Sequence, residues 1–154
     1  MVRWSDGLYG GLIAGCASAL FYAIVTVAWS HEMSLMEFFS QPAQALAPFH
    51  GAPASGLLAA LGAVLYLLTA AAFGVVYALL ARRLTSMWQA PTSVVWGLVY
   101  GLVVWFVLND VFVPISGIAN LQPLWQGLIG TVVCYGVVLS ELTTVAHRRA
   151  AGAG

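Results

Sequence analysis

One apolar run, from Ser93 to Pro114, constrains the fold more than any other part of the sequence. A membrane-spanning helix needs about 20 largely apolar residues, and this run is long enough. Its one carboxylate, Asp110, stands one helical turn before the proline. Three further apolar blocks of similar length accompany it. The sequence therefore predicts four spans, at about residues 7–29, 55–81, 93–113 and 124–146.

The composition agrees with a fold that has lipid as its solvent. Apolar residues make up 62% of the chain and charged residues only 6%, against about 25% charged in a soluble domain. A water-soluble protein with so few charges could not cover its own surface. We predict one all-α domain over residues 1–154, a four-helix transmembrane bundle.

The positive charges predict the orientation of this bundle. All five basic residues are arginines, and each lies before the first span, between the second and third, or after the fourth. The other two connections contain no Arg or Lys, and the ionisable residues between them are Glu32, Glu37, His31 and His50. Cytoplasmic loops are enriched in Lys and Arg. We therefore expect both termini in the cytoplasm and a multi-pass protein of the bacterial inner (plasma) membrane.

The first external connection, Ser30 to Ala54, contains a helix signal. Ser34 and Glu37 have the spacing of a capping box. Apolar and aromatic residues follow, and Pro42 is expected to end the helix. We predict a short helix that lies in the outer membrane interface with its aromatic side chains in lipid.

Small residues recur every four positions on the spans, which is typical of helices that approach each other closely. The sequence does not say whether the partner helix lies in this chain or in another subunit. A weak internal repeat also suggests two helical hairpins related by an axis along the membrane normal, although positive-inside sorting alone would produce its matching double arginines. The predicted packing glycines are Gly7, Gly11, Gly15, Gly74, Gly97, Gly101 and Gly136.

A resemblance rests on three stretches: GLVYGLVVWFVLNDVFVP, AFGVVYALLARR and YGVVLS. In these the chain resembles small, uncharacterised four-span bacterial inner-membrane proteins of the YagU-like kind. The resemblance implies a fold and supplies no activity. Relatives of that kind often carry a histidine within spans two and four. This chain has none there, so the resemblance implies no ligand role for histidine.

Ionisable residues inside a membrane are costly and are the first candidates for function. Asp110, beside Asn109, falls near the outer edge of span three, and Glu141 falls near the inner edge of span four. They are too far apart to pair. We expect Asp110 to bond to outer-loop groups and Glu141 to lie near the inner arginines, with proton or cation binding at Asp110 as the alternative. The middle of every span is apolar, so a conduit through one copy is not expected.

Few residues suggest a metal or catalysis. His31 and His50, with Glu32 and Asp110, could converge on the outer face as metal ligands, but no fixed spacing supports this. No histidines face each other within the spans, as haem would require. Phosphate-loop, nucleophile-elbow, HExxH and nucleic-acid-binding motifs are absent from the sequence. We predict no cofactor and no resident metal, and nothing argues for an enzyme.

The function expected from these features is non-catalytic. Small-residue strips on all four spans favour an accessory or structural subunit that packs against other membrane helices, in a hetero-complex or a homo-oligomer. Such a subunit could hold lipid, pigment or quinone between protein and bilayer. One alternative is a small transporter or channel unit that forms a path by oligomerising. A second is a lipid-modifying membrane enzyme that uses the outer-face histidines and Asp110.

Overall fold

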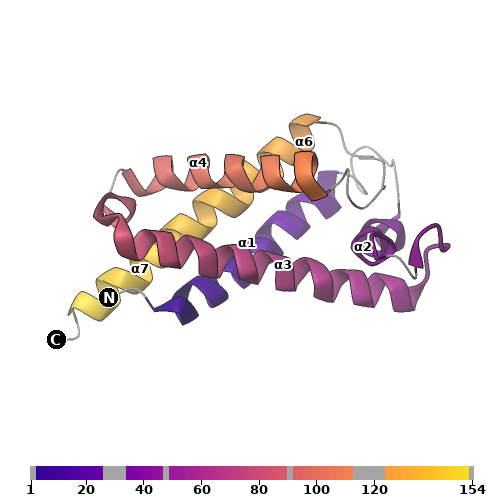
Figure 1. Ribbon diagram of the computed structural model, residues 1–154, viewed down its shortest axis with the longest axis horizontal. Coiled ribbons are helices and arrows are strands. Elements are labelled where there is room, and N and C mark those ends of the chain that lie inside the picture. The colour runs from indigo at the N-terminus through magenta and orange to yellow at the C-terminus, as the bar shows by residue number, and fades with distance from the viewer. Residues whose placement is uncertain (1–2, 26–33, 47–48, 90–91, 113–123, 153–154) are drawn as a thin grey trace.

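The computed structural model describes residues 3–25, 34–46, 49–89, 92–112 and 124–152, and these form helices joined by turns, with no strand among them (Figure 1). Four of its helices are long and apolar enough to cross a membrane. Their mean hydropathy lies between 1.7 and 2.2. These helices cover Trp4–Val25, Gly56–Arg83, Thr92–Val111 and Trp125–Arg149. They confirm the prediction of four long apolar helices, and the first begins three residues earlier than expected.

The first helix pair is α1 (Trp4–Tyr22) and α3 (Gly56–Arg83). The two backbones touch where glycine meets glycine. A Cβ atom placed on Gly74 would come within 2.6 Å of the Gly11 Cα, and one on Gly11 would lie 2.5 Å from the Ala70 carbonyl oxygen. Only residues without a Cβ allow this approach. The small-residue strips of α1 and α3 are therefore partners within one chain.

The second pair is α4 (Thr92–Phe106) with the fourth span. That span consists of α6 (Leu124–Leu128), the π-helical η5 (Ile129–Val137) and α7 (Val138–Gly152). A Cβ on Gly136 would lie 3.0 Å from the Gly101 Cα, and one on Gly97 would lie 2.6 Å from the Gly136 carbonyl oxygen. The contact of Gly136 with Gly97 and Gly101 thus repeats that of Gly74 with Gly7 and Gly11.

The two ends of the bundle differ in charge. The start of α1, the end of α7 and the 3₁₀ turn η3 (Thr85–Trp88) lie at one end, and α2 lies at the other (Figure 1). All five arginines belong to the end that holds η3: Arg3, Arg82, Arg83, Arg148 and Arg149.

The short helix α2 (Leu35–Gln44) carries the predicted capping box. The Glu37 backbone N–H donates to the Ser34 hydroxyl at 3.2 Å, and the Ser34 backbone N–H donates to the Glu37 carboxylate at 2.7 Å. The expectation that Pro42 ends the helix is wrong, because Pro42 lies inside it. Pro42 lacks an N–H donor, but helical hydrogen bonding continues past it, because the Ala45 N–H still donates to the Gln41 carbonyl at 3.1 Å.

The aromatic face of α2 does not point into lipid as predicted. Phe38 is only 7% exposed, and its ring lies 6.0 Å from that of Tyr22 on α1. Gly62 of α3 lies directly against the Phe39 carbonyl, so α2 packs on α3 through another glycine. Gly62 lets the backbone of α2 come close to α3, and in this position the Phe38 ring is buried against Tyr22 of α1. The large apolar residues of α2 that remain exposed are Leu35 and Met36.

The interior of the bundle is more polar than the sequence predicts. The Ser18 hydroxyl donates to the Gly130 carbonyl at 2.9 Å, and the Tyr22 hydroxyl donates to the Gly127 carbonyl at 3.0 Å. Tyr135 donates to the Ala70 carbonyl at 2.6 Å. A carbonyl oxygen has two lone pairs, so it can accept a hydroxyl beside its ladder bond. These bonds tie helix to helix where no water is available.

Candidate functional site: an apolar groove between α3 and α4

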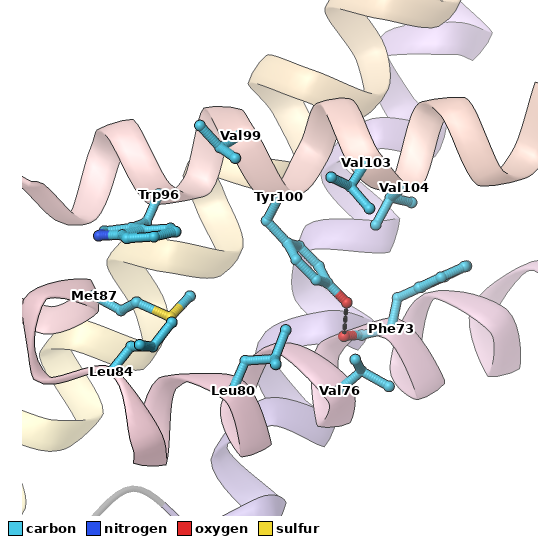
Figure 2. A pocket seen from close by; sticks show the side chains of 10 residues that line it. All are labelled: Phe73, Val76, Leu80, Leu84, Met87, Trp96, Val99, Tyr100, Val103 and Val104. Atoms are coloured by element: carbon cyan, nitrogen blue, oxygen red, sulfur yellow. Dashed lines mark hydrogen bonds between the residues drawn. The ribbon is translucent and has the colours of Figure 1, made fainter.

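A groove runs between α3 and α4, with a cavity volume of about 270 Å³ (Figure 2). Its walls come from α3, the η3 turn and α4. The lining residues are Phe73, Val76, Leu80, Leu84, Met87, Trp96, Val99, Tyr100, Val103 and Val104.

The groove exists because the small residues of α3 and α4 pack against other helices of the bundle. Gly74 of α3 faces α1, and Gly97 of α4 faces the fourth span. The sides of α3 and α4 that face each other therefore carry large side chains. Tyr77 and Tyr100 meet edge to face, with ring centroids 5.0 Å apart. These two rings keep the backbones of α3 and α4 apart, and the groove lies beside the rings.

The floor of the groove is fixed and its rim is open. Val104 and Met87 are each only 3% exposed. The rim residues Val76, Val99 and Val103 are about half exposed, with Val103 the most exposed of the three at 52%. In a membrane these rim side chains face the hydrocarbon region. The groove is thus an indentation in the surface that meets lipid.

The chemistry of the lining is that of a binding surface. The Tyr100 hydroxyl donates to the Phe73 backbone carbonyl at 2.5 Å, the dashed line in Figure 2. That bond satisfies the Tyr100 hydroxyl donor, and the Tyr100 ring forms part of the groove wall. The groove has no acid, base or thiol among its lining residues. It suits a hydrocarbon chain and offers no group for acid–base or nucleophilic chemistry.

The predicted packing glycines lie at helix contacts inside this chain. Gly7, Gly11 and Gly15 face Gly74 and neighbouring alanines of α3; a Cβ on Gly15 would lie 2.6 Å from that of Ala70. Gly97, Gly101 and Gly136 form the contact between α4 and the fourth span. These strips are therefore occupied, and they are not free to receive a helix of another subunit.

The intramembrane polar residues lie apart from the groove. Asp110 is exposed on the π-helical η4 (Val107–Phe112), beside Asn109, whose side-chain amide donates to the Trp105 carbonyl at 2.8 Å. The loop that was expected to bond Asp110 lies outside the described residues. Glu141 is exposed and accepts a hydrogen bond from the Ser93 hydroxyl at 3.1 Å.

The weak metal hypothesis finds no support in the described part of the chain. Among those residues, no group of three or more His, Cys, Asp and Glu side chains could hold a metal ion. His50 is exposed, while His31 and Glu32 lie outside the described residues.

Neither the groove nor the hydroxyls that cross-link the spans were predicted from the sequence. A signal for the groove was present: Phe73, Val76, Leu80 and Leu84 recur at three- and four-residue spacing, on one face of α3. Whether this stripe packs against another helix or lines a groove depends on which helix lies opposite it. The hydroxyls of Tyr22, Tyr100 and Tyr135 each donate to a backbone carbonyl on another helix, and the apolar character of the spans gives no sign of these bonds.

Comparison with known proteins adds nothing to these observations: no family model, curated protein or solved structure matches the chain. The groove and the distribution of charge are therefore the basis for a functional hypothesis.

Proposed function

We propose that this chain is a non-catalytic, multi-pass protein of the bacterial inner membrane, with cytoplasmic termini, that holds the hydrocarbon chain of a lipid in the α3–α4 groove. The observation that carries the proposal is the groove itself, a cavity of about 270 Å³ with a buried floor and an open rim. In this role the protein is an accessory component that keeps a lipid at a fixed place on its surface.

The arrangement of charge supports the proposed orientation. The arginines gather at the end of the bundle that holds η3, and positive residues are retained on the cytoplasmic side. The Leu84 and Met87 end of the groove then lies near the inner leaflet. A lipid of that leaflet could enter from the side, without crossing the membrane.

A lipid suits the free surface better than a partner helix does. Close helix association in a membrane depends on small residues, and the predicted packing glycines are used inside the bundle. The sides of α4 that remain exposed carry branched residues such as Val95, at 59%, and Val103. A flexible chain can follow such a surface, whereas a rigid helix would meet it at a few side chains.

The test is lipid retention by purified protein. After extraction in mild detergent, native mass spectrometry should detect a bound lipid on the wild-type chain. Val103→Trp places an indole over the groove and should abolish that adduct. Val95→Trp adds the same bulk to the same helix at a similarly exposed valine outside the lining, and should retain it. Equal lipid retention by the two variants, both eluting as folded protein, would refute the proposal.

A further inference from the structure

We infer that the groove selects an anionic phospholipid, with its hydrocarbon chain along α3 and α4 and its headgroup at Arg83. The inference rests on the proposed function and adds the class of lipid to it.

Arg83 continues the helical stripe that lines the groove. Phe73, Val76 and Leu80 are lining residues of α3, and Arg83 follows Leu80 by three positions, on the same face of the helix. The next lining residue, Leu84, is adjacent to it. Arg83 is exposed. Its guanidinium can therefore extend toward the inner interface while its stem stays beside the groove.

Trp96 closes the same end of the groove. Figure 2 shows its ring above Met87 and Leu84, with the indole nitrogen at the end of the ring that lies away from Tyr100. An indole prefers the membrane interface because its body is apolar and its N–H is a donor. This end of the groove thus combines a hydrocarbon wall with a cation and an aromatic donor.

The acids on this side of the bundle do not face the groove. Glu141 is bonded to Ser93, which lies four residues before Gly97 on the face of α4 that meets the fourth span. Asp6 accepts a hydrogen bond from the Arg3 backbone N–H at 2.7 Å, at the start of α1. The charge next to the groove is therefore positive, which is complementary to a phosphate-bearing anionic headgroup.

The hydrocarbon chain by itself cannot supply selectivity. The bilayer interior that a lipid tail leaves is as apolar as the groove that it enters. Zwitterionic and anionic lipids with identical tails therefore compete equally for the groove. The headgroup must make the difference. One arginine near an anionic lipid surface contributes about fivefold, which corresponds to ~1 kcal/mol. Arg83 alone should therefore favour an anionic lipid by about that factor.

The experiment is a competition in nanodiscs or mixed micelles that contain phosphatidylglycerol and phosphatidylcholine with identical tails, in equal amounts. Native mass spectrometry then counts each lipid on the protein. Wild type should carry about fivefold more phosphatidylglycerol. Arg83→Gln should bind the two lipids equally, and Arg83→Lys should keep most of the preference. Arg149→Gln removes an exposed arginine from the same end of the bundle, on α7, and should behave as wild type.

The outcomes separate this inference from the proposed function. If wild type binds both lipids equally, and Val103→Trp abolishes both adducts, the groove holds lipid but the anionic selectivity is refuted. If Arg149→Gln loses the preference as fully as Arg83→Gln does, general surface charge is responsible and the inference is also overturned. Absence of both lipids from wild type, or a protein found in the groove in their place, would refute the proposed function and the inference together.

Discussion

Replacing Gly97 by alanine tests whether glycine contacts hold the bundle together. A Cβ at Gly97 would lie 2.5 Å from the Ser140 hydroxyl oxygen and 2.6 Å from the Gly136 carbonyl oxygen. Ordinary contacts begin at 3.4 Å, so both distances fall short by nearly 1 Å. The hydroxyl can rotate, but the backbone carbonyl cannot move without its helix. Gly97→Ala must therefore separate α4 from the fourth span.

The expected cost is that of overpacking a close contact, about 1–3 kcal/mol of unfolding free energy. Gly56→Ala is the matched control, because a Cβ at Gly56 would meet nothing within 4 Å. Alanine is favoured over glycine in a helix by up to ~1 kcal/mol, and this effect has the same sign at both positions. Because Gly56 is the first residue of α3 and Gly97 lies inside α4, propensity alone would stabilise Gly97→Ala at least as much as Gly56→Ala, so a lower stability of Gly97→Ala reports the packing cost. Titration with a denaturing detergent, followed by tryptophan fluorescence, measures it. Equal stability of the two variants would refute the reasoning.

Three further predictions concern orientation, the outer acid and the α2 cap. A cysteine introduced at Gln44 should react with a membrane-impermeant reagent added outside the cell, and one at Ser86 should not; labelling of Ser86 would reverse the topology. Asp110→Asn should leave stability unchanged in the same detergent titration, because an amide still accepts hydrogen bonds; a folded variant with lost cellular function would favour transport. Hydrogen bonds from the Ser34 backbone N–H and hydroxyl hold the pKa of Glu37 below its usual 4.5. The cap's contribution to folding stability is therefore present at neutral pH and is lost as the pH falls through that lowered pKa. Ser34→Ala removes only the hydroxyl and should raise the pKa part of the way back in a carboxyl NMR titration; an unchanged pKa would contradict this cause.

Some of this structure could be predicted because the signals are local. The apolar run around Gly97 is long enough to span a membrane wherever it packs. The Ser34–Glu37 cap depends on residues three positions apart, so its spacing was sufficient to predict it. The small-residue strips indicated close helix contacts for the same reason, since only a face without bulk allows two backbones to touch.

The remaining features depend on which helix faces which. Phe38 was expected in lipid, but it is buried because Gly62, far away in the sequence, lets α2 settle on α3. The glycine strip of α1 could have met any helix, and its partner emerges only from the fold. The groove follows from these contacts in turn: Gly74 faces α1, and the stripe that includes Phe73 lies opposite α4 and η3.

The most direct test of the lipid-holding role is a photo-crosslinking experiment on the purified, detergent-washed protein. A photoreactive amino acid at Val103, on the groove rim, is compared with the same amino acid at Val95, which is similarly exposed on α4 outside the lining. After irradiation, intact-protein mass spectrometry should show a phospholipid-sized addition at Val103 and none at Val95. A crosslink from Val103 to another protein, or equal lipid addition at both positions, would contradict a groove that holds lipid.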